Sequence, residues 1–599
     1  MRVLSAILLL CGAIAFAPTV SSAQPGWFWQ NPLPQGNHLW GVATLNKQTV
    51  IAVGESGTVL RSGDAGESWT LPSSGTTNRL YAVSFGDGNT GVAVGELGTI
   101  LRTSDGGESW TSQLSGTTES LFAVSSFDNT ATAVGRNGTI LRTNDGGETW
   151  TVQLSGTTDL LRGVSFVDAR TGTAVSDFGG TILRTTDGGD TWVPQSTSAG
   201  LMAVSFVDAK TGTVVGRYGN IFHTTDGGET WTRQSSGTRL DLHAVSFADA
   251  NVGIAVGEAG CILQTIDGGD TWILQSRGTD FPLRGVSFIK DSTATVVGDT
   301  GTILRTVDSG ATWTRQSSGH TDILYGVSVV DANTATVVGR LGSILRTVNG
   351  GSSWTYEPSG TIARLSGVSF IDANTGFVVG EGGTILVTAD GGATWTAQAS
   401  GTTADLSQVS FVDANVGTAV GLYGTIVSTI DGTTWTRQFS GTSDHLFGVS
   451  LVDANTGTAV GSNGIILRTT DGGDTWVKQS SETLLGDALF DVSFVDANAG
   501  MAVGDRGTIL TTTSGGSTWV ARFSGTSEIL HGVSLVDRKI GIVVGRSGTI
   551  LRTTDGGATW RPQFTGTSLT LLKVAIADAE IGTSVGENGT ILHIVTSGN

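Results

Sequence analysis

The sequence predicts an all-β protein, a β-propeller of fourteen four-stranded blades. Three observations support this fold class. A turn motif, Ser/Thr-x-Asp-x-Gly-x-x-Trp, recurs thirteen times at spacings of 39 to 43 residues. A VGxxGTIL segment precedes it and occurs fourteen times. No stretch after the first residues has the 3.6-residue period of an amphipathic helix. Repeats of about 41 residues with several short strands are typical of propeller blades.

The unit at residues 160–195 shows how the strands are assigned. Residues 161–167 alternate in polarity and are rich in branched and aromatic side chains, which favours a first strand. Asp187-Gly188-Gly189 is turn chemistry, because Gly tolerates positive φ. The second, third and fourth strands are expected at residues 173–175, 181–185 and 191–195.

Fourteen blades exceed the number usual for one ring, so we expect two seven-bladed rings. The segment Trp27-Phe28-Trp29-Gln30 resembles a fourth strand, and residues 590–594 form a third strand. The N-terminal strand would therefore complete the last blade of a ring and remove its open edges. The expected boundaries are 24–309 for the first ring and 310–599 for the second. A six-plus-eight division or one larger ring remains an alternative.

The first 23 residues are predicted to be a secretory signal peptide. Arg2 provides a positive end, residues 4–17 are apolar, and Ser21-Ser22-Ala23 is a small-residue cleavage site. This predicts export to the periplasm or the cell exterior. The apolar stretch is short for a membrane span and no later window is apolar enough, so we expect no direct membrane insertion.

Charge and cysteine content restrict the partners. The formal charge is −19 and Lys and Arg together number 33, against 52 Asp and Glu, which argues against nucleic acid as the main partner. Of the two Cys, only Cys261 lies outside the leader, so no internal disulfide is expected. The seven His are scattered without ligand spacing, and no phosphate or EF-hand loop occurs. We expect no metal and no cofactor.

The aspartate of the turn motif is expected to be structural. Its carboxylate would accept hydrogen bonds from nearby backbone N–H groups, while the Trp covers the hairpin. Asn349 and Ser514 replace the Asp in two copies, which a strict ligand site would tolerate poorly. The aspartates concerned are Asp64, Asp105, Asp145, Asp187, Asp226, Asp267, Asp308, Asp390, Asp431, Asp471 and Asp555.

These motifs resemble the Asp-box (BNR) repeat of sialidases, xyloglucanases and sortilin-type receptors. The fuller unit adds VGxxGTIL before the box and a segment such as Trp150-Thr151-Val152-Gln153-Leu154-Ser155-Gly156-Thr157 after it. It most resembles the photosystem II stability/assembly factor family, over nearly the whole chain. The resemblance implies an exported, non-enzymatic propeller that binds a protein, such as a subunit of a membrane complex.

A glycosidase is the alternative, and three observations favour a non-enzyme. Tyr218 and Tyr423 both occupy the second variable position of a VGxxG turn, which favours surface turn residues over a sialidase nucleophile. Nearly all carboxylates are at periodic positions, and all sixteen Trp are in boxes or near the N-terminus. No unit carries a long insertion of the kind that usually builds an active site. We therefore expect no catalytic residues; a glycan-binding or glycan-hydrolysing envelope protein is the second hypothesis.

The variable positions of the VGxxG turns are the candidate binding residues. Both charge signs alternate there, which suits either salt bridges or recognition of a mixed-charge protein surface. The candidate partner-binding residues are Arg136, Arg217, Arg340 and Arg546, together with Glu482 and Asp487 in the longest departure from the unit. A second recurrent Arg, for example Arg142 or Arg184 in the third strands, is expected to pair with neighbouring Asp side chains.

Overall fold

The structure is a computed structural model that describes residues 26–197, 199–275, 279–289, 292–316, 319, 321–480 and 486–595. In this part of the chain there are fourteen antiparallel sheets, thirteen of four strands and one of three, and no α-helix. The three-stranded sheet is extended by a single bridge between Arg61 and Thr70. The prediction of an all-β protein with about fourteen four-stranded units is confirmed.

The sheet at residues 161–196 matches its predicted strands closely. It contains β13 (Leu161–Phe166), β14 (Gly172–Ser176), β15 (Thr181–Thr185) and β16 (Val193–Ser196), in that order. β14 is buried at every position, because sheets pack on both of its faces. One core cluster contains Val134 of the preceding sheet together with Phe166 and Trp192, so the box Trp seals the space between neighbouring sheets.

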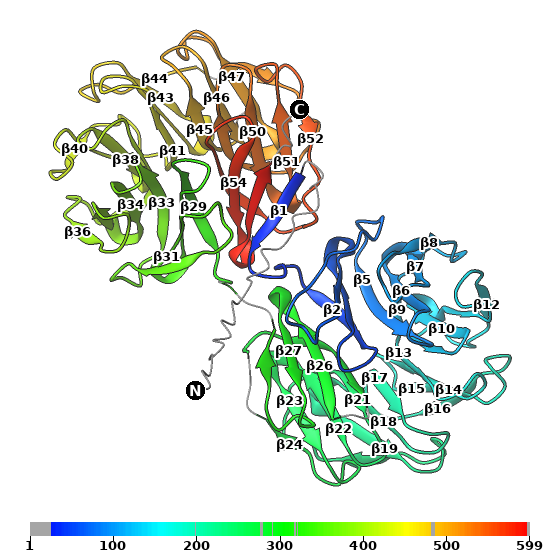
Figure 1. The fold of residues 1–599 in the computed structure, drawn as a ribbon. Helices are drawn as coiled ribbons and strands as arrows, with labels where there is room; N and C mark the ends of the chain where they lie inside the picture. The colour runs from blue at the N-terminus through cyan, green and yellow to red at the C-terminus, as the bar shows by residue number, and fades with distance from the viewer. Residues whose placement is uncertain are drawn as a thin grey trace, which may run out of the picture.

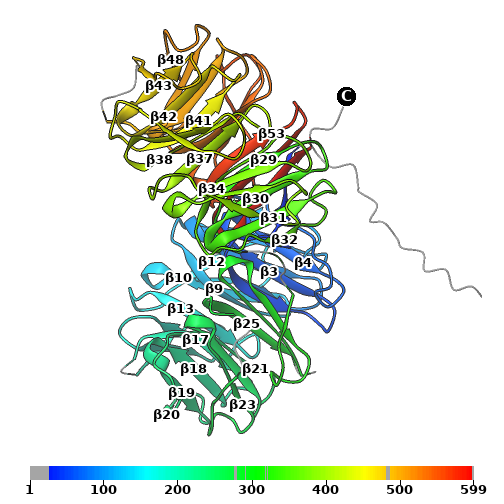
Figure 2. The same ribbon diagram turned by 90° about the vertical axis from the view of Figure 1, so that its left-hand side faces the viewer.

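The sheets follow one another around two closed circuits (Figures 1 and 2). The first strand of each sheet contacts the first strand of the next. In the first circuit these strands are β2 (Leu39–Thr44), β5 (Leu80–Phe85), β9 (Leu121–Phe127), β13, β17 (Leu201–Phe206), β21 (Leu242–Phe247) and β25 (Leu283–Ile289). In the second they are β29 (Leu324–Val329), β33 (Leu365–Phe370), β37 (Leu406–Phe411), β41 (Leu446–Leu451), β45 (Leu489–Phe494), β49 (Leu530–Leu535) and β53 (Leu571–Ile576). Contacts of β2 with β25 and of β29 with β53 close the circuits.

The N-terminal strand completes the last sheet of the second circuit. β1 (Gly26–Asn31) pairs antiparallel with β55 (Ile591–Val595), which follows β53 and β54 (Ile581–Gly586) in the sheet. Figure 1 shows β1, in blue, beside the red C-terminal strands. The first circuit is therefore inserted, in chain order, between β1 and the rest of the second circuit.

This arrangement differs from the expected boundary at residues 309 and 310. β27 (Ile303–Thr306) pairs with β28 (Thr314–Arg315), so that boundary falls within a hairpin of the sheet that begins with β25. The first circuit thus keeps its own fourth strand, and β1 is free to pair with the second. The sequence expectation had placed β1 in the first half of the chain.

Short 3-10 turns connect the second and third strands of thirteen sheets. They are η1 (Glu55–Gly57), η2 (Glu96–Gly98), η3 (Arg136–Gly138), η4 (Arg217–Gly219), η5 (Glu258–Gly260), η6 (Asp299–Gly301), η7 (Arg340–Gly342), η8 (Glu381–Gly383), η9 (Leu422–Gly424), η10 (Ser462–Gly464), η11 (Asp505–Gly507), η12 (Arg546–Gly548) and η13 (Glu587–Gly589). Because strands alternate in direction, these turns lie on one face of each circuit, which we call the η face. The Asp-boxes lie on the opposite face.

Arginines of the third strands connect neighbouring sheets. Nη1 of Arg142 donates to Thr132 Oγ1 at 2.7 Å, and its Nη2 donates to the carbonyl of Ala169 in the next sheet. Its guanidinium also lies 4.9 Å from the ring centroid of Phe166. Arg184, Arg346 and Arg468 repeat this arrangement. The expected pairing with Asp side chains is replaced here by Thr and carbonyl acceptors, because the next sheet's turn presents a carbonyl within reach.

Candidate functional site

The Asp-boxes are hydrogen-bonded turns. In the box of Asp105, Thr103 Oγ1 donates to Asp105 Oδ1 at 2.7 Å, and Ser109 donates through its backbone N at 2.9 Å and through Oγ at 2.5 Å. The carboxylate thus closes its own hairpin. Asn349 keeps two of these bonds, with Thr347 at 2.9 Å and the Ser353 N–H at 3.0 Å, which explains why the copy without Asp keeps its spacing.

These hydrogen bonds predict acid sensitivity. The donors of Ser109 and Thr103 stabilise the ionised carboxylate, and they lower the pKa of Asp105 to about 2, although desolvation opposes them. The pKa values of Asp267, Asp390 and Asp471 are likewise lowered to about 2, chiefly by the hydroxyl four residues later. Because the folded pKa lies below the unfolded one, this stabilisation is complete above the unfolded pKa, about 3.9, and is lost as the pH falls through about 2.

We therefore expect the free energy of unfolding to fall between about pH 4 and pH 2. A variant with Asn at Asp105, Asp267, Asp390 and Asp471 should lose less stability over that interval, measured by urea unfolding at each pH. The control variant carries Asn at the exposed Asp190, Asp270 and Asp474, each of which occupies the variable position three residues after a box Asp. An equal acid dependence in both variants would contradict the assignment.

A ring of side chains surrounds the axis of the first circuit near the η face. Each is the second residue of a first strand, and all are partly exposed. The position varies while the preceding Leu and the Val two residues later are nearly constant, and this variation was the signal that the sequence interpretation missed. The members of this axial ring are Trp40, Tyr81, Phe122, Arg162, Met202, His243 and Arg284.

Neighbouring members of the axial ring contact one another. The ring centroids of Trp40 and Tyr81 are 5.7 Å apart, and those of Tyr81 and Phe122 are 5.1 Å apart. Arg162 lies 4.6 Å over Phe122 and Arg284 lies 5.0 Å over Trp40. His243 continues the ring, with Nδ1 3.3 Å from Met202 Sδ and Nε2 3.1 Å from Arg284 Nη1. Burial, assisted by the charge of Arg284, lowers the pKa of His243, which keeps its imidazole neutral near pH 7.

Ion pairs surround the axial ring. Arg79 Nη2 lies 2.9 Å from Glu55 Oε1, and its Nη1 lies 3.4 Å from Glu96 Oε1. Arg284 Nη2 lies 2.9 Å from Asp299 Oδ2. The carboxylates of the η turns therefore meet arginines from the start of the first strands. These charges hold the axial ring in place and leave its aromatic and apolar parts as the distinctive feature of this face.

Bulky apolar residues project from the same face. Leu97, in η2, is 67% exposed at φ 54°, and Tyr218, in η4, is 71% exposed at φ 57°. Phe178 is 61% exposed, and Arg217 lies 4.9 Å over its ring. A left-handed backbone is costly for Leu and Tyr and less so for Gly or Asn. Exposed apolar residues in a strained conformation are typical of functional surfaces.

The predicted partner-binding residues are not brought together. Arg136 is exposed on the first circuit, and Arg340 and Arg546 are exposed on the second. Arg217 is engaged by Asp177, with Nε 2.7 Å from Oδ1. Asp487 is buried and paired with Arg506, so it is not an exposed contact residue. Glu482 lies outside the described residues.

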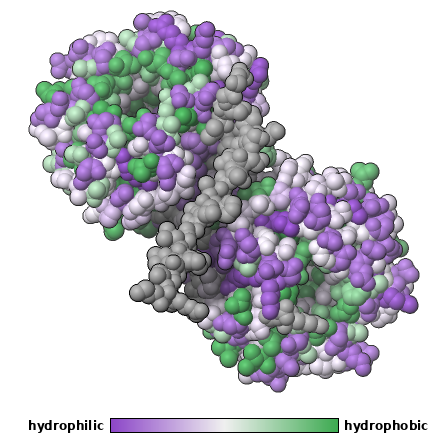
Figure 3. Space-filling view, viewed as in Figure 1, coloured by the Kyte–Doolittle hydropathy of each residue, from purple (hydrophilic) through white to green (hydrophobic). Residues whose placement is uncertain are grey.

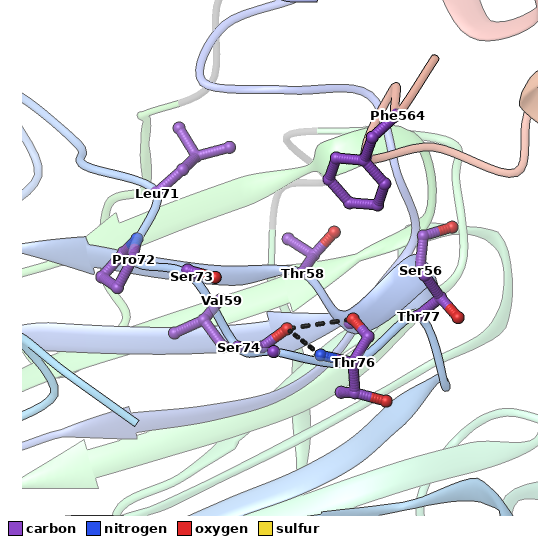
Figure 4. A pocket seen from close by; sticks show the side chains of 13 residues that line it. Ser56, Thr58, Val59, Leu71, Pro72, Ser73, Ser74, Thr76, Thr77 and Phe564 are labelled. Carbon is purple, nitrogen blue, oxygen red and sulfur yellow. Dashed lines mark hydrogen bonds between the residues drawn. The ribbon is translucent and has the colours of Figure 1, made fainter. Parts of the chain in front are cut away.

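A pocket of about 670 Å³ lies where the two circuits meet. The first circuit contributes residues 56–59 and 71–77, and the second contributes Phe564 and Gly566. Figure 4 shows Phe564 facing Thr58 and Ser56 across the pocket, and two hydrogen bonds between Ser74 and Thr76: the Ser74 hydroxyl donates to the Thr76 carbonyl and accepts from the Thr76 N–H. Buried Asn37 joins the circuits beside the pocket, donating to Thr58 Oγ1 and to the carbonyl of Gly566 at 2.8 Å each. Hydroxyl and apolar groups dominate its lining.

Within the described ranges, no helix is long and apolar enough to span a bilayer. The same residues contain no group of three or more His, Cys, Asp or Glu side chains arranged to hold a metal ion.

The chain belongs to a family of BNR-repeat propellers. The model of the family described as photosynthesis system II assembly factor YCF48 matches residues 72–156, 151–243, 236–367 and 479–587, together more than half of the chain. The resemblance inferred from the repeats is thus confirmed. No curated protein sequence matches the chain.

Three solved structures are similar to the chain, and the two GH74 structures among them share its fold. An ancestral GH74 enzyme is 13% identical with a TM-score of 0.70, over 96% of this chain and 99% of its own. A GH74 xyloglucanase from Xanthomonas campestris is 13% identical with a TM-score of 0.64, over 95% of this chain and 100% of its own. YCF48 from Cyanidioschyzon merolae is 23% identical with a TM-score of 0.40, over 47% of this chain and 98% of its own.

The GH74 matches overturn the expectation that the chain is not an enzyme. That expectation rested on regular units without long insertions. The GH74 structures have the same fold over nearly the whole chain, and they are enzymes. The fold itself therefore does not argue against catalysis.

Proposed function

We propose that the chain is a scaffold that binds a protein partner on the η face of its first circuit. The two closed circuits are interpreted as two seven-bladed propellers. Residues 39–315 form the first, and residues 324–595 with β1 form the second. This division keeps every sheet whole, which the expected boundary at residues 309 and 310 did not.

The axial ring carries the proposal. Trp, Tyr, Phe, Met and Arg are the residues enriched at the centres of protein interfaces, and Trp, Tyr and Arg dominate their hot spots. Here they form a nearly continuous set around one axis, with ion pairs at the rim. Leu97, Phe178 and Tyr218 extend this apolar surface outward. An apolar centre with a charged rim is the usual anatomy of a protein-binding patch.

Family membership supports a role in assembly. The family is named for an assembly factor, and we infer that this chain holds another protein during assembly. We further propose that residues 1–23 direct export, so that the partner is an exported protein or the exported part of a membrane-complex subunit.

The test separates binding from folding. The double variant Leu97→Asn, Tyr218→Asn should raise the free energy of unfolding by about 1 kcal/mol, because Asn tolerates φ near 55°. The same pair should weaken partner binding by about tenfold or more. The partner is first captured from an envelope extract of the source organism and identified by mass spectrometry. Its affinity for wild-type and variant chains is then measured by calorimetry.

The matched control is the double variant Leu341→Asn, Tyr423→Asn. Leu341 and Tyr423 occupy the same turn position on the second circuit, at φ 54° and 59°. The control variant should relieve similar strain without affecting the partner. Equal loss of binding in both pairs would contradict the assignment to the first circuit. Capture of polysaccharide alone would favour the glycan-binding hypothesis instead.

A further inference from the structure

A cavity lies at the axis of the second circuit. Its volume is about 130 Å³, and it is lined mostly by the second and third residues of the first strands. Phe447, Phe490 and His531 form an aromatic arc, with centroid separations of 5.6 Å and 5.2 Å. Figure 3 shows hydrophobic residues around a hollow near the middle of this part of the molecule.

The third residues of the first strands are polar at three places in the second circuit and small throughout the first circuit. The third positions of the first circuit are all Gly or Ala, whereas the second has Gln408, Asp491 and Lys573 separated by glycines. A Cβ on Gly448 would lie 2.9 Å from Asp491 Cα, and one on Gly532 would lie 3.0 Å from Lys573 Cα. A side chain at either glycine would collide with the backbone of the neighbouring strand, so the strands approach closely there, and Gln408 and Lys573 line the cavity.

The floor of the cavity is electrically neutral. Lys573 Nζ lies 2.6 Å from Asp491 Oδ1, and Asp491 Oδ2 accepts the Val533 N–H at 2.9 Å. Both oxygens of Asp491 are thus engaged, while the ammonium of Lys573 keeps further N–H donors for a ligand. Burial and the nearby charge of Arg546 lower the pKa of His531, so its ring is neutral near pH 7.

Several hydrogen-bonding groups around the cavity have no protein partner. Ser366, Ser407 and Tyr325 line the cavity, and their hydroxyls make no hydrogen bond to any described residue. Gln408 uses its oxygen for the Val449 N–H at 3.3 Å, which leaves its amide N–H₂ for a ligand. The cavity therefore pairs an apolar aromatic wall with uncharged donors and acceptors.

We propose that this cavity binds a single neutral sugar ring. A pyranose has an apolar C–H face, which packs on aromatic rings, and hydroxyls that both donate and accept. A purely apolar ligand would leave the serine, tyrosine and glutamine groups unpaired, at a cost for each. A carboxylate finds no unneutralised cation, because Asp491 already balances Lys573. The volume has room for one small ring rather than a chain.

Saturation-transfer NMR with the full chain tests the proposal. The probes are the methyl β-glycosides of glucose, galactose and mannose, with glucuronate as the charged probe. At least one neutral probe should receive saturation. Ser407→Leu and Ser366→Leu, which fill the cavity, should each weaken that binding by about tenfold or more. Ser112→Leu, at an exposed serine of the outer strand β8 (Thr111–Gln113), makes the same change away from the cavity; it is the matched control and should leave sugar binding unchanged.

Three results would overturn the proposal. They are no transfer to any neutral probe, transfer that both leucine variants leave unchanged, and transfer to glucuronate alone. The protein-binding test uses the other circuit and a different ligand, so either proposal can fail without the other.

Discussion

Trp27→Ala is expected to lower the free energy of unfolding by about 3–5 kcal/mol, and to do so within the second circuit. Trp27 lies in β1, is 7% exposed, and packs in one cluster with Ile542, Val544 and Leu592. Its removal leaves a cavity and loosens the strand that covers the edge of β55. An uncovered edge strand also templates association between chains.

Hydrogen exchange locates the effect. Protection should fall in β53, β54 and β55 while the sheets of the first circuit keep theirs. Val520→Ala, in the outer strand β48 (Val520–Arg522), is the control, because Val520 is 43% exposed. Equal loss of protection in both circuits would show that the chain unfolds as one unit.

Lys573→Met is expected to destabilise the protein by about 3–5 kcal/mol, because it leaves the carboxylate of Asp491 buried without its partner. Asp491 is 1% exposed. Adding Asp491→Asn to Lys573→Met should restore at least half of the loss, since an amide is less costly to bury than an unpaired charge.

Urea unfolding of the two single variants and the double variant measures this coupling. Lys539→Met, at an exposed lysine, should stay near wild type. Additive losses in the double variant would mean that the pair contributes no coupling and that Lys573 acts only by filling space.

Much of the fold could be predicted from periodic residues. The strand assignments for residues 161–185 agree with β13, β14 and β15 to within a residue or two, because alternation and turn chemistry act locally. The fourth-strand character of Trp27 to Gln30 was also clear. Its partner was not, because both halves of the chain offer a third strand with the same pattern, and only long-range packing selects between them.

The candidate site was harder to predict. Sequence reasoning followed the exposed turn positions, and the structure separates those arginines between two circuits. The axial ring forms because seven first strands meet at one axis. This long-range arrangement cannot be predicted from the local sequence pattern of any one strand. The same holds for Lys573 and Asp491, which are 82 residues apart and meet across Gly532.

The pairing of β1 with β55 also determines when, during synthesis, the fold can be completed. Among the described strands, β1 is synthesised first and β55 last. Both closing strands of the first circuit, β2 and β25, are made well before β55, so this circuit can fold while the second is still being made. The second circuit must wait for β55, and β1 stays without its partner until then. A chain that stops before β55 would thus contain one closed circuit and one open circuit, with two strand edges exposed to its neighbours.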